Sequence, residues 1–507
     1  MDWRKNVRIS SLILAGPILA GMVVTAAGTA QAKDKIDDSF GDIESQMEAQ
    51  PVKKAAPPAG KSMLDTSDDE FLDTAAPAAK KESKAPQTAD NPFAQLVKRA
   101  QYQLDLFTTY FPMGYSNRQV VDDHAVGWSK FQITTRASLT PDTQFNLKMH
   151  AVGSTATNEH KGVFTAPGAH GNRAKWVDVD TLSLAHQMGS NTVTIGKAPL
   201  SMGVSTLYSP ADRFEPSYAA DPTQAFRTGR WQARYDRAVG DDQFTLAVLP
   251  TDDVSVVPHK NSRWFGGTSS YAFTAMPALG AGASLAENYH DGAARNWGYL
   301  GRYKGTAGGF DYFGLAHYGP TIYPILRQRG AAMSEIYRPM ASTLAAGVST
   351  TIDRWEFHGE ASWQIASHNQ DQDFIKHVVG FSYRDSALAN SLGLDEIQPI
   401  LEYAGELVTD QQSSSGQFLA NSSSSRPLRD AVLGRVIFRI SNAWSTYVGG
   451  ARNFVDGDHS ASAGAEYKYA EDIKFKLDMS AFGGEPDTLY GRWRRNDFIR
   501  FGVVLNH

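Results

Sequence analysis

Apolar and polar side chains alternate along this chain from about Gln101 to the last residue, in stretches of roughly ten residues separated by turns. The stretch Arg354–Ala366 shows the pattern most clearly, because one face carries Trp355, Phe357, Gly359, Ala361 and Trp363 and the other carries Glu356, His358, Glu360, Ser362 and Gln364. A period of two residues predicts a β-strand. Repeated strands of this kind are typical of a transmembrane β-barrel, although a single strand of a soluble sandwich shows the same alternation.

Tight and long connections alternate between these stretches, as in bacterial barrels, which have short periplasmic turns and longer outer loops. Tight turns are predicted at Thr140–Asp142, Gly189–Asn191, Gly240–Asp242, Leu279–Gly282, Thr306–Gly309, Thr351–Asp353, Ser441–Asn442 and Glu471–Asp472. Longer connections are predicted at Gly114–Ala125, Gly153–Ala174, Val204–Phe226, Thr251–Arg263, Gly319–Ser334, Asp410–Arg429 and Gly483–Arg495. We therefore expect an all-β fold over residues 97–507: an antiparallel transmembrane β-barrel with an even number of strands, about 16–20. The upper end of this range counts weak segments such as Ala283–His290 as strands, and the lower end merges them into loops.

Two different segments precede the predicted barrel. Residues 1–32 combine basic residues, an apolar run and the small-residue site Ala30-Gln31-Ala32, which predicts a secretory signal peptide. Residues 33–96 are rich in Ala, Pro, Lys, Asp and Glu, so we expect a disordered periplasmic arm. Short acidic patterns surround Phe40 and Phe71 in this arm. They are a hypothetical docking motif for a periplasmic partner, and a solvated linker is the alternative.

Composition narrows the class of protein. The chain has no cysteine, which excludes a lipoprotein anchor, disulfides, thiolate-zinc sites and covalent haem attachment. After the predicted signal peptide no apolar stretch of about 18 residues occurs, so only a closed barrel would carry this sequence across a bilayer. The formal net charge of −5 gives no support for nucleic-acid binding. We expect the chain in the outer membrane, in contact with lipid and lipopolysaccharide and without a cofactor.

The end of the chain has the pattern of a last barrel strand. Ile499, Phe501, Val503 and Leu505 alternate with other residues up to the terminus. This pattern resembles the segment that the barrel-insertion machinery recognises, which makes that machinery an expected partner. His507 stands where the family pattern has Phe.

The polar face of each strand is expected to point into the lumen and to tune selectivity. The predicted pore-lining residues are Arg230, Arg234, Arg302, Lys304, Glu356, His358, Glu360, Arg435, Arg439, Lys474 and Lys476, and the same faces carry Lys468, Asp178, Asp180, Glu402 and Glu466. The arginine pairs suggest a ladder for an anionic solute, because guanidinium groups bind carboxylate and phosphate bidentately. The alternative is structural: Arg–Glu pairs that cross-link the inner wall. Mixed charge also suits a general diffusion pore.

An enzymatic site is the weakest prediction. Glu356, His358 and Glu360 share one strand face at intervals of about 7 Å, which suits two metal ligands or an acid beside a base. No third partner follows from the sequence, and a lumenal row of polar groups is the favoured alternative. The chain has no nucleophile elbow, HExxH pair or phosphate-binding glycine loop, so no catalytic residue or metal site is predicted.

One region carries a family resemblance. The stretch Gly196–Phe214, GKAPLSMGVSTLYSPADRF, resembles the strand-loop element of the alginate-export-like group of proteobacterial outer-membrane barrels, and Arg230–Pro250 continues the likeness. The matching residues are Gly203, Pro210 and Asp212, which shape the loop in that group, whereas the usual Trp is replaced by Met202. The resemblance implies a monomeric barrel with loops folded over a polar pore that exports an acidic polysaccharide.

Three functions remain as hypotheses. The first is a channel that exports an acidic polysaccharide, the second is a general or solute-specific uptake porin, and the third, distant, is a surface enzyme on a barrel scaffold. A barrel of about twenty strands should enclose water unless loops fold into it. We therefore expect a channel rather than a filled barrel.

Overall fold

The computed structural model describes residues 91–114, 124–155, 174–251, 253–259, 262–265, 284–288, 290, 292–330, 333–412, 418–420, 422 and 426–507. The predicted signal peptide, the acidic patterns around Phe40 and Phe71 and all but the last residues of the predicted arm lie outside the described residues.

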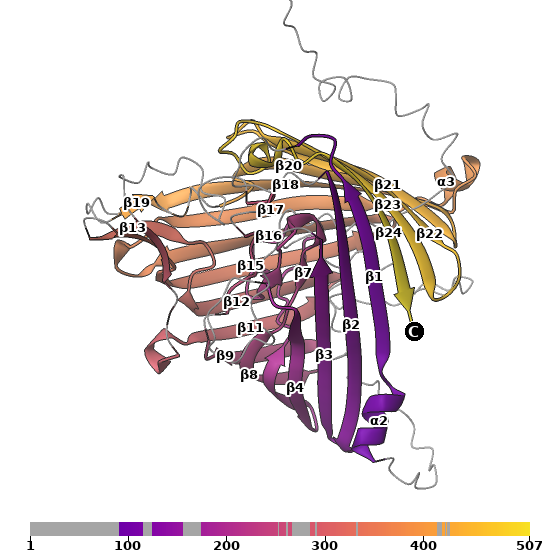
Figure 1. Ribbon diagram of the computed structural model, residues 1–507. Coiled ribbons are helices and arrows are strands. Elements are labelled where there is room, and N and C mark those ends of the chain that lie inside the picture. Colours follow the sequence, from indigo (N-terminus) through magenta and orange to yellow (C-terminus); the bar gives the residue numbers. More distant parts are fainter. Residues whose placement is uncertain are drawn as a thin grey trace, which may run out of the picture.

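Eighteen strands form one closed antiparallel sheet (Figure 1). They are β1 (Gln101–Tyr110), β2 (Ala125–Thr140), β3 (Thr143–Ser154), β4 (Val177–Met188), β5 (Asn191–Ala198), β8 (Arg230–Val239), β9 (Asp242–Leu249), β11 (Gly298–Ala307), β12 (Phe310–Pro320), β15 (Met340–Ile352), β16 (Trp355–Ala366), β17 (Asp373–Tyr383), β18 (Glu396–Asp410), β20 (Asp430–Ser441), β21 (Trp444–Asn453), β22 (His459–Lys468), β23 (Ile473–Gly483) and β24 (Phe498–Asn506). Each strand pairs with its neighbours along this series, and β1 pairs with both β2 and β24, which closes the barrel. The predicted fold class and the even strand number are confirmed.

The count of eighteen strands lies within the expected range of 16–20, and one region decides where in that range it falls. β9 pairs directly with β11, register Leu249 to Gly298, so the chain between these residues is a single connection rather than a further hairpin. The weak segment Ala283–His290 contains β10 (Ser284–Asn288), which belongs to a separate sheet outside the barrel series. The tight turn predicted at Leu279–Gly282 lies outside the described residues.

Short connections gather at one end of the barrel, called the turn end here. Every other predicted tight turn joins neighbouring strands there, and Gly189 and Gly240 adopt positive φ values of 65° and 63° that favour glycine. The connection between β17 and β18 at this end is longer and contains α3 (Ala387–Ser391). The opposite end, called the loop end, carries the long connections. The rule that bacterial barrels have short turns on the periplasmic side predicts that the turn end is periplasmic.

A short helix, α2 (Pro92–Lys98), precedes β1 at the turn end. Its first residues fall within the arm that was predicted to be disordered up to residue 96. Thr135 on β2 donates from Oγ1 to the Leu96 carbonyl at 2.6 Å, and the Ser138 backbone N–H donates to Gln95 Oε1 at 3.0 Å. The helix is therefore fastened to the outer side of β2.

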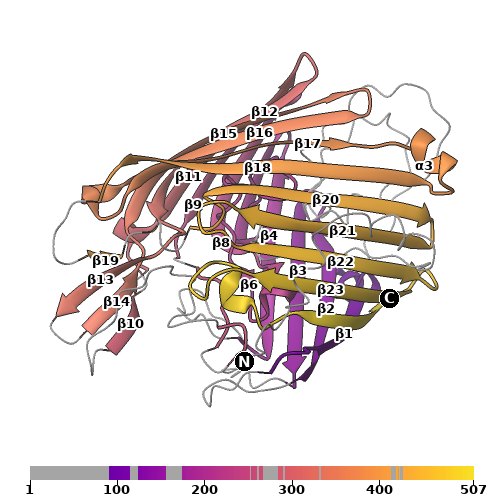
Figure 2. The same cartoon turned by 90° about the horizontal axis from the view of Figure 1, so that it is seen from above.

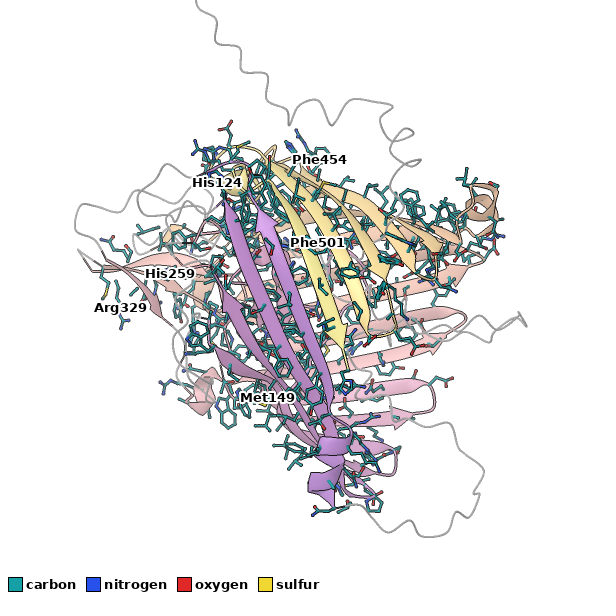
Figure 3. The ribbon with its side chains drawn as sticks, turned by 45° about the vertical axis from the view of Figure 1, so that its right-hand side comes forward. His124, Met149, His259, Arg329, Phe454 and Phe501 are labelled. Atoms are coloured by element: carbon teal, nitrogen blue, oxygen red, sulfur yellow. The ribbon has the colours of Figure 1, made fainter. Side chains whose placement is uncertain are left out.

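The outer face of the barrel carries exposed apolar side chains on most strands. They include Leu106, Phe131, Ile195, Leu246, Leu344, Trp363, Leu407, Ile499 and Phe501, the last labelled in Figure 3 on β24. A bilayer requires apolar side chains in contact with lipid and hydrogen-bond partners for all backbone groups. A closed sheet with an apolar exterior meets both requirements. The chain therefore spans the outer membrane as a barrel. None of the helices among the described residues is long and apolar enough to cross a membrane.

Smaller elements lie within the connections. A four-stranded sheet combines β10, β14 (Met333–Tyr337), β13 (Ile325–Gly330) and β19 (Phe418–Ala420), and Figure 2 shows these strands together, away from α3. A two-stranded sheet pairs β6 (Ser217–Tyr218) with β7 (Phe226–Arg227). In the described part of the chain, the 3-10 helices are η7 (Pro222–Gln224), η8 (Ala294–Asn296), η9 (Ser367–Asn369) and η11 (Gly491–Trp493).

Candidate functional site

The connection between β5 and β8 folds into the barrel, and residues 199–229 are called the inserted loop here. It starts after Ala198 and contains β6, η7 and β7 before it returns to Arg230. Its residues contact inward-facing side chains of strands on several sides of the wall. A water-filled lumen was expected unless loops fold into it, and over the section that this loop crosses a loop does fold into it.

Two glutamates of the inner wall hold the far side of the inserted loop. On β16, Glu360 Oε2 accepts the backbone N–H groups of Val204 at 2.8 Å and Ser205 at 3.3 Å. Its Oε1 accepts the Ser209 hydroxyl at 2.5 Å and the Ala211 N–H at 3.1 Å.

Glu402 on β18 holds the next residues in the same way. It accepts the backbone N–H groups of Thr206, Leu207 and Tyr208 at 2.8, 2.7 and 2.8 Å. Only 1% of Glu402 is exposed. Because buried N–H groups must be paired, these two carboxyl groups take the place of a sheet or helix partner for this part of the loop.

The rest of the predicted polar row on β16 supports these anchors. His358 lies 3.0 Å from Glu402 Oε1 through Nε2, and Glu356 accepts the Ser382 hydroxyl at 2.9 Å. The structure therefore brings Glu356, His358 and Glu360 together on the inner wall, as the two-residue period predicted. Among the described residues no group of three or more His, Asp or Glu side chains has the arrangement of a metal site.

Apolar contacts fix the inserted loop on three sides. Leu200, Met202 and Phe214 pack against inward-facing side chains of β9, β11, β12 and β15. Leu207 and Tyr208 join a larger cluster with β17, β18, β20 and β21. The returning part of the loop packs against β3 through Tyr218 and Phe226.

The predicted arginines nearest the loop bind its backbone. Arg230 donates to the carbonyls of Phe214 at 3.0 Å and Thr251 at 3.2 Å, and Arg234 donates to the carbonyl of Pro199 at 2.9 Å. Arg302 donates to the Ser201 carbonyl at 3.4 Å. Lys304 lies half-buried on the same strand as Arg302. These hydrogen bonds to backbone carbonyls are structural contacts of a kind that neither the ladder for an anionic solute nor the Arg–Glu alternative predicted.

The other predicted basic residues lie on β20 and β23 with acidic partners nearby. Lys474 and Lys476 lie 3.5 and 3.4 Å from Glu466, and Arg439 lies 3.9 Å from Glu396. Arg435 is buried and stacks on the Tyr447 ring, 4.9 Å from its centroid. Lys468, at the turn end of β22, is exposed.

The three residues named from the family resemblance all lie in the inserted loop. A Cβ on Gly203 would come within 1.9 Å of Ser209 Oγ, so the backbone approach there requires glycine. Pro210 is buried between Ser209 and Ala211, which both bind Glu360.

Asp212 links two other parts of the inserted loop, at Met202 and at Arg227. It accepts the Met202 N–H at 2.9 Å and lies 2.5 Å from Arg227. Burial alone would raise the pKa of Asp212, but the Arg227 guanidinium and these hydrogen bonds hold that pKa below its usual value of 3.8.

Sequence reasoning missed the anchor at the opposite wall, Arg500 on β24. This buried side chain donates to Thr109 Oγ1 at 2.9 Å, to Thr223 Oγ1 at 2.7 Å and to Asp221 Oδ2 at 3.0 Å. The alternation of Ile499 and Phe501 on the outer face already placed Arg500 inside. No sequence pattern indicated that its partners would be loop residues 277 and 279 positions away.

A second segment, residues 253–259 and 262–265, also enters the barrel at the loop end. Val256 bridges to Tyr218 of the inserted loop. Trp264 is buried among Phe111, Phe482, Trp493 and Phe498, and its carbonyl accepts the Trp493 indole N–H at 2.9 Å. The last long connection of the barrel therefore helps to hold this segment in place.

No family model matches this chain, and no curated protein sequence matches it. OccAB3 of Acinetobacter baumannii is similar over 80% of this chain and 99% of its own, with 9% identity and a TM-score of 0.44. OccD3 of Pseudomonas aeruginosa shows 10% identity over 80% of this chain and 91% of its own, with a TM-score of 0.44. Wzi, an outer membrane protein of Escherichia coli, shows 11% identity over 82% and 86%, with a TM-score of 0.42. TM-scores below 0.5 are too low to carry an argument about this chain.

Proposed function

We propose that the protein is an outer-membrane channel for small polar solutes, with a lumen narrowed by the inserted loop. The observation that carries this proposal is the pair of anchors Glu360 and Glu402, which hold the loop against the inner wall through six backbone N–H groups and one hydroxyl: those of Val204, Ser205, Thr206, Leu207, Tyr208 and Ala211, and that of Ser209. A loop that is fixed at a set place inside a barrel sets an upper limit on the size of a solute.

The physical basis is the relation between strand number and width. A barrel of eight strands is filled by its own side chains, whereas barrels of 16–18 strands leave an aqueous lumen. This barrel has eighteen strands, so its wall alone would pass solutes without selection. The inserted loop removes part of that space, and the polar side chains of the remaining wall favour solutes that keep their hydration.

A swelling assay with reconstituted liposomes tests this function. Liposomes that contain the purified protein are mixed with isotonic sugars of increasing size, from a pentose to a tetrasaccharide. We expect fast swelling with the pentose and a sharp fall before the tetrasaccharide. Liposomes that do not swell with any sugar would refute the channel, and equal rates for all sugars would refute the size limit.

Export of an acidic polysaccharide is the second candidate. The inner faces of β20 to β23 favour it, because they carry Arg435, Arg439, Lys474 and Lys476 against the acids Glu466 and Asp478. The family resemblance at Gly203, Pro210 and Asp212 points the same way. A polymer would need more room than the docked loop leaves, so this candidate requires the loop to move. Block of the channel current by polyuronate, added from the periplasmic side, would support it.

The expected partners belong to the same proposal. Outer-membrane lipid and lipopolysaccharide would surround the apolar exterior, and the barrel-insertion machinery would recognise the last strand. A periplasmic partner for the arm of residues 33–96 remains a hypothesis. Deletion of residues 33–84 with unchanged transport and unchanged co-purifying proteins would refute it.

A further inference from the structure

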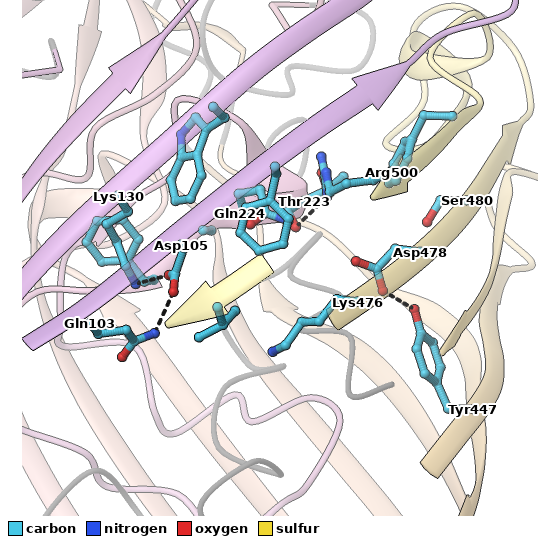
Figure 4. A pocket seen from close by; sticks show the side chains of 16 residues that line it. Gln103, Asp105, Lys130, Thr223, Gln224, Tyr447, Lys476, Asp478, Ser480 and Arg500 are labelled. Atoms are coloured by element: carbon cyan, nitrogen blue, oxygen red, sulfur yellow. Dashed lines mark hydrogen bonds and ion pairs between the residues drawn. The ribbon is translucent and has the colours of Figure 1, made fainter. Parts of the chain in front are cut away.

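A pocket lies on the inner wall where the barrel closes (Figure 4). Inward-facing side chains of β1, β2, β23 and β24 form one side, and residues Thr223–Phe226 of the inserted loop form the other. The space that water molecules can occupy inside it is about 70 Å³, and the pocket is open to the lumen, so only part of a sugar ring would enter it.

Aromatic rings form much of the lining. Phe107 lies over Gly502, where a Cβ would come within 2.3 Å of the ring, and Tyr447 lies over Gly464, where a Cβ would come within 2.1 Å. In both places the glycine leaves room for the ring to lie close to the wall. Trp128, whose ring centroid is 5.6 Å from that of Phe107, adds a large apolar surface.

Charged groups also line the pocket, and each cation has a carboxylate partner. Lys130 lies 3.2 Å from Asp105, Lys476 lies 3.4 Å from Glu466, and Arg500 lies 3.0 Å from Asp221. The pocket therefore presents polar hydrogen-bonding groups without an excess of positive charge. An anionic ligand would have to compete with carboxylates that are already in place, whereas a neutral ligand would not.

A neutral sugar ring has the matching chemistry, with apolar C–H faces and a rim of hydroxyl groups. The aromatic rings would cover its faces, and the amides of Gln103 and Gln224 and the hydroxyl of Ser480 would reach its rim. We propose that this pocket is a subsite for one neutral sugar residue of a saccharide that enters the lumen. The assignment rests on the proposed channel, because a saccharide reaches the pocket only through the lumen.

Saturation-transfer NMR on the full chain, folded in a detergent without a sugar headgroup, tests the pocket without any need for conductance. The probes are maltotriose, which is neutral, and trigalacturonate, which is anionic. We expect maltotriose to bind more tightly than trigalacturonate. Replacing Trp128 with alanine should lower the affinity for maltotriose about tenfold, which corresponds to the loss of one stacking surface.

Two further variants keep the result interpretable. Trp363→Ala removes an indole from the outer face and should leave maltotriose binding unchanged. Ala225→Phe fills the pocket from the loop side without altering the wall and should also weaken binding. A folded Trp128→Ala protein that binds maltotriose as well as the wild type, or a wild type that binds neither probe, would overturn the proposal. Tighter binding of trigalacturonate would overturn its neutral character.

The liposome assay separates this proposal from the channel itself. If maltotriose binding depends on Trp128 but the protein causes no liposome swelling, the subsite is supported and the channel is refuted. If the liposomes swell with the expected size limit but the protein binds no saccharide, the channel is supported and the subsite is refuted.

Discussion

The Leu207 backbone N–H donates to Glu402 Oε1 at 2.7 Å although the two residues are 195 positions apart in the chain. The donor belongs to a loop that left the wall after β5, and the acceptor belongs to β18 of the barrel series. The lumen of this protein is therefore shaped by a segment that crosses it and is anchored to the inner wall by buried carboxyl groups.

Arg500 should be one of the most sensitive positions for stability. Its guanidinium is 2% exposed and binds Asp221, Thr223 and Thr109. We expect Arg500→Met to lower the free energy of unfolding by about 3 kcal/mol, because a buried pair loses one partner. Urea unfolding of the detergent-folded barrel, followed by tryptophan fluorescence, measures the change. In a double-mutant cycle, Asp221→Asn should cost clearly less in the Arg500→Met background than alone, and equal costs would contradict their coupling.

Replacement of Arg230 and Arg234 should loosen the loop rather than reverse ion selectivity. Both side chains donate to backbone carbonyls, of Phe214 and Thr251 in one case and of Pro199 in the other. We expect Arg230→Gln/Arg234→Gln to increase conductance noise and protease cleavage within the inserted loop. Arg439→Gln, near the turn end, is the control and should leave cleavage unchanged. A large loss of anion selectivity without any change in cleavage would instead support the hypothesis that these arginines form a ladder for an anionic solute.

Gly203 should not tolerate a side chain. A Cβ there would come within 1.9 Å of Ser209 Oγ, the hydroxyl that donates to Glu360. Gly203→Ala should therefore displace Ser209 and destabilise the docked loop by about 1–3 kcal/mol. Gly314→Ala is the matched control, because no atom lies within 4 Å of its added Cβ. Hydrogen exchange of the loop amides measures the effect, and equal exchange in the two variants would contradict it.

The stabilisation that Asp212 gives to the docked loop should be insensitive to pH in the neutral and mildly acidic range. Arg227 and the hydrogen bonds of Asp212 hold its pKa below the usual value of 3.8 in the folded protein. A carboxyl group with a lowered pKa stabilises the fold above its unfolded pKa, and the stabilisation is lost as the pH falls through the lower, folded pKa.

The difference in channel conductance between the wild type and Asp212→Asn should therefore stay constant from pH 7 to about pH 4 and shrink only below that range. Asp212→Asn should show loop release at neutral pH as well. A difference that already shrinks between about pH 5 and pH 6 would contradict the role given to Asp212.

The two-residue period was sufficient to predict most of the fold. On β16 it placed Glu356, His358 and Glu360 on one face and Trp355, Phe357 and Trp363 on the other, because the pleat of a strand leaves no other choice. It could not predict the path of the inserted loop. That path depends on hydrogen bonds from backbone N–H groups of Val204 to Ala211 to carboxyl groups that lie at least 149 positions away in the chain. Nearly every residue has a backbone N–H group, so the sequence does not indicate which of these groups will bind a distant side chain. The exact strand count within the expected 16–20 stayed open for a similar reason, since the β9–β11 pairing is set by tertiary contacts rather than by local alternation.

Single-channel conductance of the wild type and of Glu360→Ala/Glu402→Ala in planar bilayers tests the central claim most directly, with Glu396→Ala as a control at the turn end. The loop would lose both anchors, so we predict a small, steady conductance for the wild type and the control. The double variant should show an unsteady conductance at least about twofold larger, toward that of an unobstructed barrel of this size. A folded double variant with the conductance of the wild type would contradict the claim that these two glutamates hold the loop that narrows the lumen.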